Sequence, residues 1–149
     1  TRRPSNKFMY YAGVHYYFDK PIDFDGSDIL DIDMIEKNSY ELAFGAEYKL
    51  GNSFRLSAGW LMNRPGVNKA YQSERRFSLP SNTIGAGFGL RVSDLIDFNA
   101  GVSYTLYKRE EKNYSYTPEV SDEEVMVSEY YDKRTFILSV GVDFLFGEN

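Results

Sequence analysis

The sequence predicts an all-β protein, an antiparallel transmembrane β-barrel, and three observations lead to this prediction. Six segments alternate large apolar residues with small or polar ones, at the side-chain period of two that a strand has. Each segment has about ten residues, and a tilted strand of that length spans the roughly 25 Å apolar band of an outer-membrane barrel. The connections are alternately long and short, which is typical of such barrels. A soluble β-sandwich or a lipocalin-like barrel is the alternative, because half-buried strands share this period.

The six strands are expected near residues 7–18, 40–50, 53–63, 83–93, 96–107 and 134–146. Apolar residues occupy every second position of each strand, in series that begin at Phe8, Tyr40, Phe54, Ile84, Ile96 and Phe136. Gly51-Asn52 and Ser93-Asp94-Leu95 are turn sequences, and they make the two short connections. The long connections cover residues 19–38, 63–82 and 108–133 and are predicted to be polar loops. Short turns are periplasmic in these barrels, so the long loops are expected to be extracellular.

The composition fits this class and excludes several others. Hydrophobic residues make up 42% and aromatic residues 17% of the 149 residues, which suits one folded domain. The mean hydropathy of -0.47 is low because a barrel strand needs only alternate residues to be apolar. No apolar run reaches the length of about 18 residues that a spanning helix requires. A net charge of -5 argues against a nucleic-acid partner, and the absence of cysteine excludes disulfides and thiolate metal sites.

Six strands are too few to close a barrel, since known single-chain bacterial barrels begin at eight strands. Unpaired backbone groups at a sheet edge in lipid cost several kcal/mol each. Residues 1–149 are therefore expected to be the C-terminal portion of a larger barrel, whose missing N-terminal half would pair with the first and last strands. Assembly with copies of the same chain is the alternative.

The order of these segments resembles the C-terminal part of the FadL/TodX family of outer-membrane transport proteins. The stretches that carry the resemblance are residues 40–48 (YELAFGAEY), 54–60 (FRLSAGW), 76–80 (RFSLP), 83–89 (TIGAGFG) and 97–104 (DFNAGVSY). In the family, a loop containing an S-[IL]-P element likewise precedes a glycine-rich strand and a D-[FV]-x-x-G-[VL]-x-Y strand. The resemblance covers nearly the whole chain.

The resemblance implies a barrel of about fourteen strands in the outer membrane of a Gram-negative bacterium, within the size range of such barrels. It implies passive uptake of long-chain fatty acids or other hydrophobic compounds, with membrane lipid and a hydrophobic small molecule as partners. No enzymatic activity and no cofactor are expected. The alternative function is an outer-membrane structural or interaction barrel, whose acidic loops engage a surface partner.

The lumen-lining or ligand-contacting candidates are five residues that are expected on the inner face: His15, Tyr17, Arg55, Arg91 and Tyr107. Arg55 and Arg91 fit either of two interpretations. They form a cationic site for a carboxylate head group, which arginine holds bidentately. Alternatively they form a salt-bridge ladder with Glu47, Asp97 or Asp143, as the polar interior of such barrels favours. His15 is the only histidine, and it lacks the companions that a metal site or a catalytic triad requires.

Two further patterns suggest ligand sites on first inspection. Residues 19–36 carry five acidic positions that invite a calcium hypothesis: Asp23, Asp25, Asp28, Asp31 and Asp33. Their spacing does not match the EF-hand, because Gly26 directly follows Asp25, and an acidic surface loop is the alternative. Residues 85–89 contain the pattern G-x-G-x-G, but these glycines lie at period two within an expected strand. They are predicted to keep one wall of the lumen smooth, or to let a plug or another backbone approach closely.

Overall fold

The computed structural model describes residues 1–2, 5–20, 34–73, 75, 77–118 and 123–145. Eight β-strands and one short 3-10 helix form in these residues, and no α-helix does. The strands are β1 (Phe8–Tyr17), β2 (Ser39–Leu50), β3 (Phe54–Arg64), β4 (Ser81–Ser93), β5 (Ile96–Tyr107), β6 (Glu110–Tyr116), β7 (Val125–Tyr131) and β8 (Arg134–Phe144), and the 3-10 helix is η2 (Lys69–Tyr71). The all-β prediction is confirmed.

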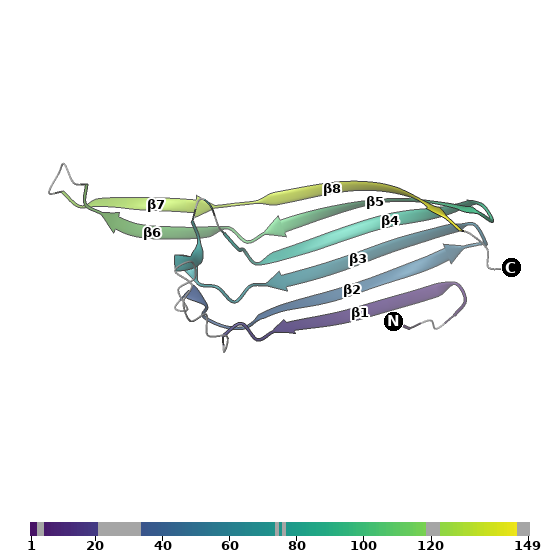
Figure 1. Ribbon diagram of the computed structural model, residues 1–149, viewed down its shortest axis with the longest axis horizontal. Coiled ribbons are helices and arrows are strands. Elements are labelled where there is room, and N and C mark those ends of the chain that lie inside the picture. Colours follow the sequence, from purple (N-terminus) through teal and green to yellow (C-terminus); the bar gives the residue numbers. More distant parts are fainter. Residues whose placement is uncertain (3–4, 21–33, 74, 76, 119–122, 146–149) are drawn as a thin grey trace.

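Six of the strands form one antiparallel sheet in the order β1-β2-β3-β4-β5-β8 (Figure 1). Each strand is bonded to its neighbour in the chain, except that β8 follows β5 after the insertion of β6 and β7. Gly51 has a φ of 73° in the tight β2–β3 turn, a conformation that suits glycine. In the β4–β5 turn the Ser93 hydroxyl accepts a hydrogen bond from the Leu95 amide at 3.2 Å. Both short turns lie at the end of the sheet where the chain termini are drawn.

Strands β1 and β8 are the edges of this sheet, and in the described part of the chain they do not pair with each other. The free edge of β1 carries one isolated bridge to the N-terminal residues. The Arg2 amide donates to the Tyr10 carbonyl at 2.8 Å, and the Tyr10 amide donates to the Arg2 carbonyl at 2.9 Å. The described strands are thus an open sheet, not a closed barrel.

The hairpin β6–β7 lies where the sequence predicts a polar loop, and it extends beyond the sheet (Figure 1). Its ladder runs from the pair Glu110–Tyr131 to the pair Tyr116–Val125. The hairpin also contacts the preceding long connection, because the Lys112 ammonium donates to the Gln72 carbonyl at 2.9 Å. Hydrophobic alternation does not mark these strands, since they have no extended apolar face. Backbone pairing and tertiary contacts hold them instead.

The other long connections are also tied together. Ile35 and Val67 form a β-bridge, and the amides of Glu36 and Lys37 both donate to the Gly66 carbonyl at 2.9 Å. Gly66 is buried, and a side chain there would collide with the Lys37 carbonyl. This close backbone approach requires glycine. We call the paired segments 34–38 and 65–68, together with the β6–β7 hairpin, the loop platform.

The two faces of the six-stranded sheet differ in chemistry. On the outer face the exposed fractions of Phe136, Leu138 and Val140 are 66%, 72% and 73%. Among the described residues only two apolar side chains, Leu79 and Tyr131, are buried, and both lie in or beside the long connections. A soluble sandwich would bury the apolar face of its sheet against a second layer. The described strands of this sheet have no such layer.

Candidate functional site: the concave inner face

The inner face is formed by the residues that alternate with the apolar ones, and its middle consists mainly of small side chains. Two adjacent cross-strand rows contain Gly45, Gly59, Gly85 and Ser103 in one, and Ser57, Gly87, Gly101 and Ser139 in the other. The glycines of the G-x-G-x-G pattern lie within β4 at period two and face this side, as predicted. Because these side chains are short, the wall is smooth at its middle.

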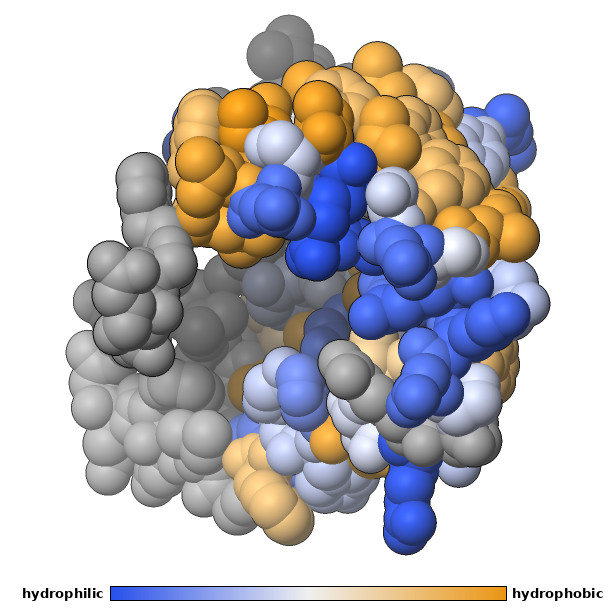
Figure 2. All heavy atoms as spheres, turned by 90° about the vertical axis from the view of Figure 1, so that its right-hand side faces the viewer, coloured by the Kyte–Doolittle hydropathy of each residue, from blue (hydrophilic) through white to orange (hydrophobic). Residues whose placement is uncertain are grey.

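A trough of about 940 Å³ lies over this inner face, and its lining includes residues of all six strands of the sheet. Figure 2 views the molecule from the end with the short turns and shows the hollow. Hydrophobic residues cover the outer surface at the top of that view, and hydrophilic residues lie beside the hollow. The sheet is therefore curved, with its polar side concave.

The Tyr11 ring lies across the small residues of the trough. Tyr11 is the direct cross-strand partner of Gly45. A Cβ atom built on Gly45 would overlap the Tyr11 ring, and one built on Gly59 would be 3.3 Å from the Tyr11 hydroxyl. An aromatic side chain that covers a cross-strand glycine shields backbone that would otherwise be exposed. Tyr11 is thus the largest side chain that projects over the middle rows.

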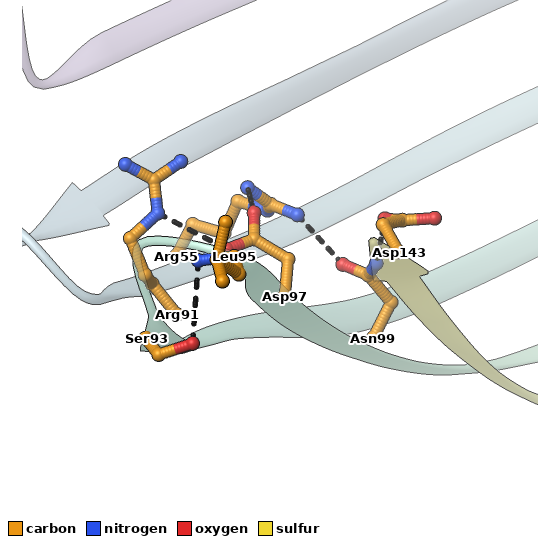
Figure 3. A network of polar contacts seen from close by, with 7 residues as sticks. All are labelled: Arg55, Arg91, Ser93, Leu95, Asp97, Asn99 and Asp143. Atoms are coloured by element: carbon orange, nitrogen blue, oxygen red, sulfur yellow. Dashed lines mark hydrogen bonds and ion pairs between the residues drawn. The ribbon is translucent and has the colours of Figure 1, made fainter. Parts of the chain in front are cut away.

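A polar network lies at the end of the trough near the short turns (Figure 3). Arg55 donates to Asp97 at 3.1 Å and to Asn99 at 2.7 Å, and Arg91 donates to the other oxygen of Asp97 at 3.0 Å. Asn99 in turn donates to Asp143 at 2.6 Å. Asp97 is only 4% exposed. The two arginines thus form salt bridges in this structure, and Asp97 is the acid that joins them.

The register of the strands explains why Asp97 is the acid that pairs with Arg55 and Arg91. Asp97 is directly opposite Arg91 across the short β4–β5 turn. Arg55 is directly opposite Gly89, and its guanidinium lies over that glycine, where a Cβ atom would overlap it. The space above Gly89 lets Arg55 reach across β4 to β5. Both terminal nitrogens of Arg55 are engaged within the network, whereas Arg91 uses only its Nε in the hydrogen bonds of Figure 3.

The opposite end of the inner face, toward the long connections, carries a second, smaller cluster around Glu41. His15 Nδ1 and the Tyr17 hydroxyl lie 3.3 Å and 3.4 Å from one carboxylate oxygen of Glu41, and Asn63 donates to the other at 2.8 Å. His15 remains largely exposed, with 71% of its side chain accessible. At the far side of the sheet, the Lys133 ammonium lies 5.1 Å from the centre of the Tyr107 ring.

The five residues predicted from sequence thus lie on the inner face in separate groups. Arg55 and Arg91 meet at one end, and His15 and Tyr17 meet at the other, near one edge of the sheet. Tyr107 is close to neither group, because it belongs to β5 near the opposite edge. Sequence reasoning did not select Tyr11, Glu41 or Asn99. All three occupy inner-face positions of the alternation, but which neighbours they reach depends on the register between strands.

No ligand site of another kind emerges from the described residues. Within them, no group of three or more His, Cys, Asp or Glu side chains is arranged to hold a metal ion. The aspartates of the calcium hypothesis lie in residues 21–33, outside the described part of the chain. The single described helix, η2, is far too short and polar to cross a membrane.

The chain matches no protein-family model, no curated protein and no solved structure. What the protein does must therefore be argued from the two faces of its sheet.

Proposed function

We propose that the six-stranded sheet is part of the wall of an outer-membrane β-barrel, in a channel for passive uptake of long-chain fatty acids or other hydrophobic compounds. Further strands complete the barrel by pairing with the free edges of β1 and β8. The resemblance to the FadL/TodX family supports this proposal, and it also suggests the outer membrane of a Gram-negative bacterium as the location.

One observation carries the proposal: most large apolar side chains of the sheet face away from the trough, and its lining face consists mainly of small or polar residues, with Leu61 and Ile137 as apolar exceptions. In water this arrangement is unfavourable, since burying apolar surface contributes roughly 25 cal/mol per Å² and this sheet leaves such surface exposed. In a bilayer the same arrangement is favourable, because lipid covers the outer face and the lumen hydrates the inner one. The aromatic pairs Phe54–Phe88 and Phe88–Phe98, with ring centres 5.9 Å and 6.1 Å apart, fit an interfacial girdle.

The inner face also suits passage of an elongated molecule. The two middle rows of the inner face bear one charged side chain, that of Glu47, which is the cross-strand neighbour of Ser57. Near the short turns, Asp97 forms salt bridges with both Arg55 and Arg91 and offsets part of their positive charge. A molecule that moves along this smooth wall between polar ends meets no strong binding site, so its free energy has no deep minimum along the path. Passive diffusion requires such a path.

Uptake of labelled oleate by cells that lack or express the full-length gene tests the proposal. The sharpest variant is Ser103→Trp, which adds an indole to the middle of the trough, with Val102→Trp as its control on the outer face of the same strand. We expect Ser103→Trp to reduce uptake several-fold and Val102→Trp to leave it unchanged at equal surface expression. Uptake that does not depend on the gene would refute the transport proposal.

The loop platform favours a second candidate, an outer-membrane barrel that presents a surface for a partner. Its bridge at Ile35–Val67 and its contact between Lys112 and Gln72 give the long connections a defined shape. Gly66→Ala would disturb this shape without touching the trough. If the interaction function is correct, Gly66→Ala impairs the cellular phenotype of the gene, and Ser103→Trp does not.

A further inference from the structure

A one-residue register shift separates the six-stranded sheet from the β6–β7 hairpin. Leu106 is opposite Arg134 at the end of the β5–β8 ladder, and Glu110 is opposite Tyr131 at the start of the β6–β7 ladder. The segment that joins β5 to β6 has three residues between these pairs (107–109), whereas the segment that joins β7 to β8 has two (132–133). An extra residue of this kind is a bulge, and it changes which face the side chains on either side of it take.

The shift places two consecutive cations on the outer face. The Lys108 amide donates to the Pro80 carbonyl at 2.7 Å, which continues the β4–β5 pairing, so Lys108 alternates onto the face of Leu106. The Arg109 guanidinium lies 4.6 Å from the centre of the Tyr130 ring. Tyr130 precedes Arg134 by an even number of residues, and it therefore shares the outer face with it. Arg109 is consequently on this face as well.

Lys108, Arg109 and Arg134 form an outer cationic cluster at a specific height. Moving along the outer face toward the long connections, the β5–β8 pairs are Val102–Leu138, then Tyr104–Phe136, then Leu106–Arg134. Apolar pairs thus give way to an aromatic pair and then to cations. On a membrane barrel this sequence marks the boundary between hydrocarbon and head groups, where aromatic rings and basic side chains concentrate.

All three cations of the cluster are exposed, and no ion pair within 4.0 Å engages any of them among the described residues. Glu111 and Asp132 fall on the same face, yet neither forms such a pair with the cluster in the described part of the chain. With Glu111 and Asp132 counted, this part of the outer face has three cations and two anions, a net charge of +1, whereas the whole chain has a net charge of -5. Concentrating positive charge on one boundary of an acidic protein indicates an anionic partner there.

We propose that the outer cationic cluster binds phosphate groups of the outer-leaflet glycolipid, the phosphorylated lipid A head group. The inference rests on the proposed membrane location, which sets the cluster at head-group height beside the Tyr104–Phe136 pair. Lysine and arginine bind phosphate oxygens through charge-assisted hydrogen bonds, and the arginines do so bidentately. The Arg109 guanidinium lies 4.6 Å from the centre of the Tyr130 ring, within the range of a cation–π contact that limits its motion.

The test uses the full-length protein refolded in neutral detergent, with binding of diphosphorylated lipid A and of its dephosphorylated form measured by native mass spectrometry. The variant is Lys108→Gln/Arg109→Gln/Arg134→Gln. The control is Lys7→Gln/Lys49→Gln/Lys69→Gln, which removes three exposed cations elsewhere. Because each basic residue near a lipid surface contributes on the order of 1 kcal/mol, we expect the variant to bind diphosphorylated lipid A about 100-fold more weakly. The control should bind it like the wild type.

Several outcomes overturn the inference. Equal binding of the two lipids by the wild-type protein would do so without any variant, and so would an equal loss in the control. Competition by inorganic phosphate at the concentration of the lipid would assign the cluster to free anions instead. Insertion into phosphatidylcholine vesicles is scored separately by the heat-dependent gel mobility of the folded protein. Failure to insert refutes the proposed function, whereas insertion without phosphate preference refutes only this inference.

Discussion

The Tyr11 ring lies directly over Gly45, its cross-strand partner, in space that a Cβ atom on that glycine would need. The absence of a side chain at Gly45 thus leaves the space that the Tyr11 ring occupies. This relationship predicts a specific non-additivity between the two positions, because the atoms in conflict are at the movable end of the Tyr11 side chain.

Gly45→Ala should displace the Tyr11 ring and lower the free energy of unfolding by about 1 kcal/mol, the order of one lost packing contact. In a Tyr11→Ala background the same change should be neutral or stabilising, since alanine is favoured over glycine in a strand by roughly 0.5–1 kcal/mol. A double-mutant cycle by urea unfolding in detergent measures this. Equal effects of Gly45→Ala in both backgrounds would show that the ring does not occupy the space.

The Arg55–Asp97–Arg91 network predicts unequal roles for its two acids. Asp97→Asn removes the acid with which both arginines form salt bridges in the described part of the chain and leaves two positive charges close together, so it should lower the unfolding midpoint. Asp143→Asn should change the midpoint little, because it only accepts from Asn99 and an amide oxygen can replace it. The measurement is the urea midpoint of each variant. A larger loss in Asp143→Asn would contradict the geometry.

The β6–β7 hairpin should weaken in acid through Glu129. Hydrogen bonds from the Tyr131 and Tyr114 hydroxyls, at 2.6 Å and 2.8 Å, hold the pKa of Glu129 below its ordinary value of 4.5. A carboxyl whose folded pKa is lowered stabilises the folded form above its unfolded pKa, and this stabilisation is lost as the pH falls through the folded pKa. Amide exchange in β6 and β7 should therefore accelerate below about pH 4.5.

Glu129→Gln is the control for this pH dependence. The amide cannot titrate, so exchange in the hairpin should become insensitive to pH in that range once the intrinsic rate is corrected. Exchange in β3 and β4 should follow neither trend, because the carboxylate of Glu129 accepts its hydrogen bonds from Tyr114 and Tyr131 of the hairpin. A wild-type hairpin that is equally protected at pH 3 and pH 7 would contradict the assignment.

The sheet could be predicted from the sequence because a strand with one apolar face has apolar residues at every second position. Phe98, Ala100 and Val102 are an example of this pattern. Its strand order followed from the short turns and from the neighbouring positions of antiparallel strands. The hairpin β6–β7 could not be predicted, since its strands carry no local apolar period and its contact through Lys112 is with Gln72, which is distant in the sequence.

The inner-face site was predictable only as a set of inward positions. Alternation placed Arg55 and Arg91 on that face, but three acids remained available to them. The structure selects Asp97 through register, since it puts Asp97 opposite Arg91 and leaves Gly89 open beneath Arg55. The position of Tyr11 over Gly45 depends on the pairing of β1 with β2, which a long connection separates in the sequence. No local signal fixes such a register.

The central claim is that lipid covers the outer face and water the inner one, and adjacent residues of β8 test it most directly. Val140→Arg places a charge on the outer face near mid-height, and Ser139→Arg places the same charge over the trough. Folding of both variants of the full-length protein into phosphatidylcholine vesicles is followed by urea titration. We predict that Val140→Arg lowers the free energy of unfolding by about 2–4 kcal/mol and that Ser139→Arg lowers it by well under half as much. Equal penalties at the two positions, or a larger one at Ser139, would contradict the account.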